Sequence, residues 1–175
     1  GSVLISPENK NFFYLDDEHK IISRKAKTSK IGTDYHEIIF ASRDIENVFI
    51  PSSINYICPY AFYQCENLKS FEFSENSKIE SIGEFAFAGT LIEKIKLPKS
   101  VKCLEKGTFY ICEKLKEVEF SDVVSIGEFA FFCTSISNIS ISNKVCQICK
   151  GAFSRCRSLK VFEIQEESEI QTIAE

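Results

Sequence analysis

The pair Ala-Phe recurs along this sequence at a nearly constant spacing, and no other feature constrains the fold as strongly. The pair stands at residues 61–62, 86–87, 130–131 and 152–153, with Thr108-Phe109 as a variant. The successive phenylalanines are 25, 22, 22 and 22 residues apart. Self-similarity with a period of roughly 20–50 residues is typical of chains that stack one small structural unit many times. The sequence therefore predicts a repeat array.

Two apolar positions precede each of these phenylalanines at fixed distances. Eight residues before the phenylalanine stand Ile54, Ile79, Val101, Val123 and Val145. Five residues before it stand Ile57, Ile82, Leu104, Ile126 and Ile148. Because one repeat cannot bury its apolar face alone, we expect these columns to form a continuous core between stacked repeats. The same core should hold the anchor phenylalanines Phe62, Phe87, Phe109, Phe131 and Phe153.

A second block follows each anchor phenylalanine and alternates as a β-strand does. Its apolar positions are Leu68-Phe71-Phe73, Ile92-Ile95-Leu97, Leu115-Val118-Phe120, Ile136-Ile139-Ile141 and Leu159-Phe162-Ile164. One such strand in every ~20–29 residues is the pattern of a leucine-rich repeat. We therefore predict a mostly β repeat solenoid, a curved right-handed leucine-rich-repeat superhelix. It should carry a parallel sheet on one face and short irregular or 3-10 turns on the other.

The residues around the anchor resemble a known family. The block Ala-Phe-x-x-Cys-x-x-Leu, preceded by Ile-Gly-Glu-Phe at residues 82–85 and 126–129, is similar to the BspA-like leucine-rich-repeat family. That family comprises surface proteins of bacteria and of protozoa such as Trichomonas or Entamoeba. The resemblance implies an adhesin-like module that recognises host-cell or matrix components and has no catalytic residues. The sequence departs from the family pattern at Thr108, in place of Ala, and at Thr90, where Cys is expected.

Residues 1–44 do not fit the repeat register, and the repeats of about 22–25 residues occupy 45–175. We expect the first segment to be a degenerate repeat or β-hairpin insert that seals one end of the core. Its strands should be at 3–5, 12–15, 21–22 and 38–41, with a basic loop at 24–30. Gly1-Ser2 resembles the remnant of a cleaved tag. The lack of Met and a last repeat that stops before its phenylalanine predict a chain cut at both ends.

Charge and hydropathy narrow the range of partners. The net charge is -4, from 21 basic and 25 acidic residues that are well mixed along the chain. A nucleic-acid partner requires a clustered basic face, so we expect none. There is no run of 18 apolar residues, so we expect no membrane insertion by this chain. The family resemblance implies a protein or glycoprotein partner.

The cysteines have a regular placement. Cys65, Cys112, Cys133 and Cys156 each stand three residues before the first apolar residue of a strand block. We expect them to be small buried apolar side chains, although stacking at ~5 Å would also allow a column of disulfides. Cys146 and Cys149 form one Cys-x-x-Cys, and a structural zinc needs a second pair, so no metal or other cofactor is expected. Cys58 and Cys149 share a column with glycines and should be turn residues.

No catalytic constellation stands out in the sequence. His19 and His36, the two histidines, both lie in the irregular first segment, where a solvated loop position is expected. There is no phosphate-binding loop, nucleophile elbow or pair of carboxylates with catalytic spacing. We therefore expect that this chain is not an enzyme, although a catalytic domain elsewhere in a longer protein stays an open alternative.

The outward positions of the strand blocks form the candidate binding face. The candidate residues are Phe49, Lys69, Glu72, Glu93, Lys94, Lys96, Lys116, Glu117, Glu119, Asn138, Lys160 and Glu163. The sign of the charge alternates from strand to strand, and opposite charges on neighbouring strands stabilise a sheet by about 0.2–1 kcal/mol per pair. The columns can therefore serve either the sheet or a partner. Phe49 is the plausible contact residue, since an outward aromatic is typical of binding surfaces.

Two settings fit these features. A module of a cell-surface or extracellular protein is the first, and the N-glycosylation tripeptide that begins at Asn138 is compatible with it. An intracellular leucine-rich-repeat scaffold in the cytoplasm is the alternative. Free thiols throughout the chain would favour the alternative, since exposed cysteines oxidise outside the cell.

Overall fold

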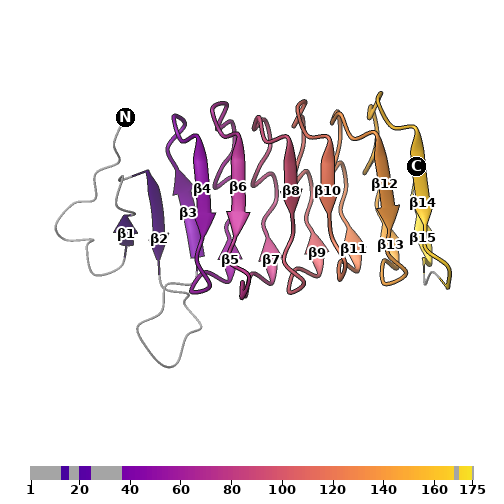
Figure 1. Cartoon of the computed structure of the whole chain (residues 1–175), viewed down its shortest axis with the longest axis horizontal. Coiled ribbons are helices and arrows are strands. Elements are labelled where there is room, and N and C mark those ends of the chain that lie inside the picture. The colour runs from indigo at the N-terminus through magenta and orange to yellow at the C-terminus, as the bar shows by residue number, and fades with distance from the viewer. Residues whose placement is uncertain (1–12, 16–19, 25–36, 168–169, 175) are drawn as a thin grey trace.

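The computed structural model describes residues 13–15, 20–24, 37–167 and 170–174. In this described part the chain is a β-solenoid of about six turns, without a helix. Each coil runs from a short strand through a tight turn to a longer strand, and then through a loop back to the next short strand (Figure 1). The expected strand at 3–5, both histidines and most of the basic loop lie outside the described residues.

The longer strands lie on one side of the coil, where the alternating blocks predicted them. They are β4 (Asn47–Ile50), β6 (Ser70–Phe73), β8 (Lys94–Lys96), β10 (Glu117–Glu119), β12 (Asn138–Ile141) and β14 (Val161–Ile164). They pair in parallel and in register as β4 with β6, β8 with β10, and β12 with β14. We call their solvent side the long-strand face.

A second sheet lies on the opposite side of the coil, where we expected irregular turns. Its short strands are β5 (Tyr56–Ile57), β7 (Ser81–Ile82), β9 (Cys103–Leu104), β11 (Ser125–Ile126), β13 (Gln147–Ile148) and β15 (Thr172–Ile173). With the N-terminal strands they form, among the described residues, a nine-stranded sheet. A strand of two residues has one inward and one outward side chain, so its alternation does not show in the sequence.

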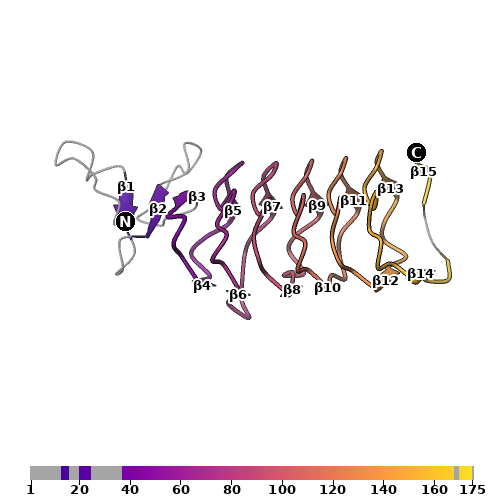
Figure 2. The same cartoon turned by 90° about the horizontal axis from the view of Figure 1, so that it is seen from above.

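The coils stack along an axis that is close to straight, and not along the curve that we expected (Figures 1 and 2). The physical reason is that both long sides of the coil are made of parallel strands. Strands paired in a sheet lie ~4.7–4.9 Å apart, both in the continuous short-strand sheet and within the three pairs of long strands. A solenoid bends when its two sides differ in spacing, and paired strands on both sides keep that difference small.

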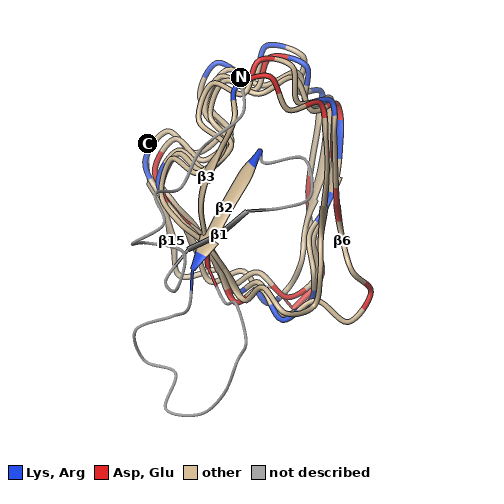
Figure 3. Ribbon diagram, turned by 90° about the vertical axis from the view of Figure 1, so that its left-hand side faces the viewer, with Lys and Arg blue, Asp and Glu red and all other residues tan. Residues whose placement is uncertain are grey.

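The N-terminal strands β1 (Phe13–Leu15) and β2 (Ile21–Arg24) form an antiparallel hairpin. Strand β2 then pairs in antiparallel fashion with β3 (Glu37–Ala41), which pairs in parallel with β5. Viewed along the axis, β2 crosses the outline of the coils, and Ile21 packs against the core (Figure 3). The parallel stack therefore starts at β3, before the boundary at residue 45 that the register indicated.

The anchor phenylalanines form a column of stacked rings along the core. Their ring centroids are 5.2–5.5 Å apart, and the planes of neighbours differ by 6–12°. Phe62, Phe87, Phe109 and Phe131 have 0% exposed surface, whereas Phe153 in the last complete coil is only partly buried. An aromatic pair contributes about 0.5–1.5 kcal/mol beyond its buried area, so the column binds each coil to the next.

The turn between the short and the long strand has two lengths, which alternate along the chain. Coils that begin at residues 58, 105 and 149 have six residues from the anchor phenylalanine to the first apolar residue of the strand block, and we call them type A. Coils that begin at 83 and 127 have five, and we call them type B. The array therefore repeats every second coil.

This alternation corrects the placement of Cys133. Counted back from the strand, Cys133 joins Cys65, Cys112 and Cys156, but its coil is type B and one residue shorter. The structure puts Thr134 in the buried column and Cys133 at a half-buried position with a φ of 57°. The inner column thus reads Cys65, Thr90, Cys112, Thr134 and Cys156. Cysteines in it lie two coils apart, about 9.6 Å, which is too far for a disulfide.

Each type B coil is fitted to the type A coil that follows it. The ring of Phe85 lies over Gly107, where a Cβ atom would be 2.3 Å from the ring, and Phe129 lies over Gly151 in the same way. The hydroxyl of Thr90 is 3.4 Å from Sγ of Cys112, and that thiol donates to the carbonyl oxygen of Phe87 at 3.1 Å. Thr134 and Cys156 repeat this contact at 3.3 Å.

The other interface, between a type A coil and the type B coil that follows it, depends on the glycine that begins the type B coil. A Cβ at Gly83 would lie 2.4 Å from the backbone nitrogen of Pro59, and one at Gly127 would lie 2.6 Å from the carbonyl oxygen of Leu104. Only glycine allows the two backbones to approach so closely. Both kinds of interface therefore need unlike neighbours, which gives the two-coil period its physical basis.

Candidate functional site

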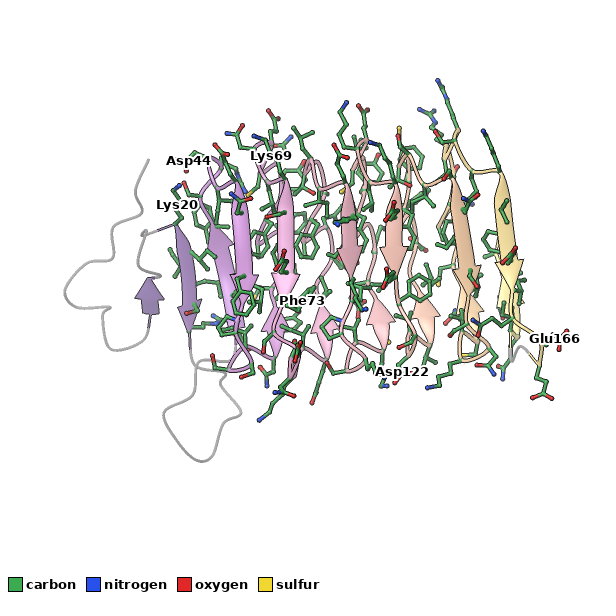
Figure 4. All side chains as sticks on the ribbon, in the orientation of Figure 1. Lys20, Asp44, Lys69, Phe73, Asp122 and Glu166 are labelled. Atoms are coloured by element: carbon green, nitrogen blue, oxygen red, sulfur yellow. The ribbon has the colours of Figure 1, made fainter. Side chains whose placement is uncertain are left out.

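The long-strand face carries the residues that the sequence proposed for binding. Seen along the axis, charged residues gather along the side of β6 and at the two ends of the outline (Figure 3). Lys69 lies near the end of the coil where the tight turn stands, and Asp122 lies at the opposite end (Figure 4). The candidate positions Lys69, Glu72, Glu93, Lys94, Lys96, Lys116, Glu117, Glu119, Asn138, Lys160 and Glu163 are all exposed.

Opposite charges on this face meet across neighbouring strands. The ammonium of Lys96 is 3.3 Å from the carboxylate of Glu119, its register partner. The ammonium of Lys116 is 3.1 Å from Glu93, and that of Lys69 is 3.6 Å from Glu46. All six side chains are more than half exposed, so each ion pair is weak. The face is a mosaic of paired charges that a partner can compete for at small energetic cost.

Phe49 interrupts this polar mosaic. It is 63% exposed and stands opposite Glu72 in the ladder between β4 and β6. Two residues before it in the same ladder, the hydroxyl of Ser70 donates a hydrogen bond to the side chain of Asn47 at 2.7 Å. A large apolar ring held by two paired strands is a preordered contact for a partner.

At the loop edge, which joins each long strand to the next short one, Asp122 links its own coil to the coils on both sides. Its carboxylate accepts hydrogen bonds from the ammonium groups of Lys144 and Lys102, the latter at 3.3 Å. These two contacts lower the pKa of Asp122 below its usual range. The carboxylate therefore stays ionised through the physiological range and holds the loops of neighbouring coils together.

The cysteines belong to the architecture, and none is in a disulfide, although the described part includes all eight. Burial raises the pKa of Cys112 to about 11, and the pKa values of Cys65 and Cys156 are raised for the same reason. A thiol that stays protonated is a poor nucleophile and a poor metal ligand. Cys149 is half-buried, and the thiol of Cys146 donates to the carbonyl oxygen of Val124 at 3.4 Å.

Within the described ranges, no cluster of three or more His, Cys, Asp or Glu side chains could hold a metal ion. The same ranges contain no helix long and apolar enough to cross a membrane. The two histidines lie outside them, so the structure gives no position for either.

An aromatic ridge that was not predicted from the sequence lies on the turn edge, the edge formed by the tight turns. The ridge consists of Tyr60, Tyr63, Phe85, Tyr110, Phe129 and Phe132. Its residues stand two before or one after an anchor phenylalanine, and such positions looked variable because no single column is aromatic throughout. The two positions are three residues apart, so their side chains share one side of the turn. Taken together, the two positions hold an aromatic residue in four successive coils, and that pattern could have predicted the ridge.

The turn edge has a backbone suited to displaying side chains. In each complete coil two turn positions have a positive φ, as at Tyr60 (61°) and Gln64 (53°). The amide groups of the turn donate to the next coil, as Phe62 does to the carbonyl oxygen of Ala86 at 2.8 Å. These inter-coil hydrogen bonds offset the cost of about 1–2 kcal/mol for each left-handed residue. The ridge side chains are therefore carried on a rigid backbone.

The fold and its repeating core define the class of protein, a leucine-rich-repeat solenoid. The sequence model described as BspA type leucine-rich repeat region matches residues 33–160 with six copies. The chain thus belongs to the BspA-type leucine-rich-repeat family. No curated protein matches the sequence.

Solved structures share this fold. The pneumococcal vaccine antigen PcpA is 26% identical, with a TM-score of 0.68 over 82% of this chain and 34% of its own. A leucine-rich cell surface protein from Faecalibacterium prausnitzii is 22% identical, with a TM-score of 0.58 over 90% of this chain and 53% of its own. A leucine-rich repeat protein of T. pallidum is 20% identical, with a TM-score of 0.64 over 86% of this chain and 78% of its own. The chain spans about a third of the length of the first and about half of the second.

Proposed function

We propose that this chain is a macromolecular recognition module of a cell-surface, adhesin-like protein, and that it binds a protein or glycoprotein of host cells or matrix through its long-strand face. The observation that carries the proposal is the regular, solvent-exposed mosaic of weakly paired charges on the long-strand face, with Phe49 exposed on its first strand. Support for a surface location comes from the family and from the likeness to a pneumococcal antigen. Catalysis plays no part in the proposal.

The charged residues of the long-strand face contribute little to the stability of the fold and can contribute more to the binding of a partner. An exposed ion pair contributes about 0–1 kcal/mol, so the alternating charges add little to the fold. A partner with complementary charges gains specificity and a faster association from the same groups. Phe49, on the first strand of the face, supplies an exposed aromatic contact of the kind that is enriched in protein interfaces.

The test measures binding of the 175-residue chain to a panel of host-surface and matrix glycoproteins by surface plasmon resonance. The informative variant exchanges the members of one pair, Lys96→Glu with Glu119→Lys, which keeps the ion pair and changes the surface pattern. Phe49→Ser is the second variant. We expect at least one partner to bind the wild type and to lose about tenfold in affinity with each variant. Absence of any partner in the panel, or binding of both variants with the affinity of the wild type, contradicts the proposal.

An intracellular scaffold is the second candidate, and the free thiols favour it. Surface labelling of intact cells that express the natural protein separates the two settings. Protection of the protein from a membrane-impermeant biotin reagent, with labelling after lysis, supports the intracellular scaffold. Labelling of intact cells supports the surface module.

A further inference from the structure

We propose that the aromatic ridge is a second binding surface, and that it holds a proline-rich peptide in the polyproline II conformation along the axis of the solenoid. The acidic end of that peptide lies over the last complete coil. The inference extends the proposed function to a different surface, since it rests only on the chain being a binding module and makes no use of the long-strand face.

The ridge is continuous across four coils. Tyr63 contacts Tyr60 at a centroid distance of 5.6 Å, and Tyr60 stacks on Phe85 at 5.5 Å. Phe85 meets Tyr110 edge-on at 5.7 Å. Tyr110 stacks on Phe132 at 4.9 Å, and Phe132 meets Phe129 at 5.8 Å. Since each ring is held by its neighbours, little side-chain entropy remains to be lost on binding.

The ridge is open to a partner along this length. Tyr60 is 50% exposed, and the other five side chains are partly exposed. Ile111 and Leu91, at 38% and 37%, are further exposed apolar residues of the segments between the short and the long strands. A row of ordered, partly exposed aromatics is the kind of surface on which proline rings dock.

The spacing of the ridge selects the conformation of the peptide. Tyrosines recur at one turn position in type A coils, Tyr63 and Tyr110, and phenylalanines at another in type B coils, Phe85 and Phe129. Two coils span about 9.4–9.8 Å. Polyproline II rises ~3.1 Å per residue with three residues per turn, about 9.3 Å. An extended strand repeats every ~6.6–6.8 Å and an α-helix every ~5.4 Å, and neither repeat equals the two-coil distance.

The charges beside the ridge indicate the polarity of the partner. Along its middle Lys106 lies 3.2 Å from the carboxylate of Glu128, so these two charges neutralise each other. The last complete coil instead presents the exposed cations Lys150, Arg155 and Arg157, and the guanidinium of Arg155 lies 5.4 Å from the ring of Phe132. An uncharged stretch followed by acidic residues complements this distribution. The three tyrosine hydroxyls of the ridge, all in type A coils, can donate to peptide carbonyl groups, which polyproline II leaves free.

The experiment titrates the chain with two synthetic dodecapeptides, nine prolines followed by three aspartates and the reverse order, by isothermal calorimetry. A peptide with alternating glycine and serine in place of the prolines is the matched control. We expect one proline peptide to bind with a Kd below about 1 mM and the control to bind at least tenfold more weakly. Tyr60→Ala and Tyr110→Ala should each weaken binding by about tenfold. Arg155→Gln should weaken it and reduce its salt dependence.

Phe49→Ala is the matched variant, because it removes an exposed aromatic from the other face. Thermal unfolding of each variant verifies that the fold is kept, and Tyr110→Phe retains the ring if the alanine variant does not fold. The proposal is overturned if neither proline peptide binds, if the glycine-serine peptide binds equally, or if Phe49→Ala weakens binding as much as the ridge variants do. Binding of a β-linked glucose hexasaccharide in place of the peptides also overturns it. If one of these results is obtained while the chain still binds a glycoprotein through its long-strand face, only the ridge proposal fails and the proposed function stands.

Discussion

At the scale of single residues, position in a column decides what a side chain does. Phe109 lies between Phe87 and Phe131 with no exposed surface, whereas Phe49 is a phenylalanine on a strand and is 63% exposed. The alternation of side chains along strand β4 turns Phe49 outward, whereas the repeat register places Phe109 in the core. Both can be read from the sequence.

Truncation of an anchor phenylalanine should therefore be severe. We expect Phe109→Ala to lower the free energy of unfolding by ~3–5 kcal/mol, because the deleted ring leaves a cavity in a closed column. Urea titration measures the change, and Phe49→Ala should stay within about 0.5 kcal/mol of the wild type. A loss below 1 kcal/mol for Phe109→Ala is incompatible with its place in the stack.

Gly107 tests the fit between unlike coils. Its φ is 59°, and a Cβ there would be 2.3 Å from the ring of Phe85. Gly107→Ala should lose roughly 2–4 kcal/mol, from backbone strain together with the clash. Gly89→Ala is the control, since its φ is 73° but its nearest neighbour would be 3.4 Å away, so only the strain of about 1 kcal/mol remains. Equal losses for the two variants would show that the ring of Phe85 moves aside.

The buried thiol of Cys112 gives stability a dependence on alkaline pH. Burial raises its pKa from 9.0 to about 11. Because the folded pKa is the higher one, this contribution is fully present below pH 9 and is lost as the pH rises toward 11. Between pH 8 and 10 the wild type should lose about 1 kcal/mol more than Cys112→Ala does, by urea titration at each pH. Parallel pH profiles for the two proteins would mean that the thiol ionises freely in the folded state.

At the scale of elements, the length of a strand decides whether it can be predicted from the sequence. The long strands alternate over enough residues to be recognised, and their register follows from the repeat. In the short strands β5, β7, β9, β11, β13 and β15, only the inward position is apolar in every repeat. The sequence therefore predicted a core position there and did not predict a strand. Their pairing is a property of the stack, because each short strand has partners only when coils lie above and below it.

The charge pairs on the long-strand face should respond to reversal in a predictable way. Lys96→Glu places two carboxylates opposite each other at Glu119 and should destabilise by about 0.2–1 kcal/mol at low salt. Adding Glu119→Lys should restore the wild-type value. Urea titration at low and at high salt gives the comparison, and salt should remove most of the difference. A single reversal without effect at low salt would indicate that the pair is open in solution.

At the scale of the whole molecule, the two-coil period makes deletions unequal. Deletion of residues 105–148 removes one type A and one type B coil and leaves unlike neighbours in contact. Deletion of 105–126 removes one coil and sets Phe85 against Phe129. We expect the shorter deletion to be less stable than the longer one by about 1–3 kcal/mol in urea, although it removes less core. Greater stability of the shorter deletion would argue that coils are interchangeable, as in a simple array.

The sequence by itself determined the repeat period, the anchor column, the apolar columns and the outward set of the long strands. These features are local in sequence, since each depends only on the spacing of residues within one coil and on its recurrence. The family followed from the same spacing. Charge alternation on the long-strand face could also be predicted, since the register defines which residues are neighbours.

Only the tertiary structure decided the second sheet, the straight axis, the place of Cys133 and the aromatic ridge. Each depends on what one coil presents to the next. A turn shorter by one residue moves Thr134 into the column that Cys133 was expected to fill, and Phe85 reaches Tyr110 only because Gly107 leaves room for its ring. Spacing within a coil cannot encode such contacts, because they arise from the packing of unlike neighbours.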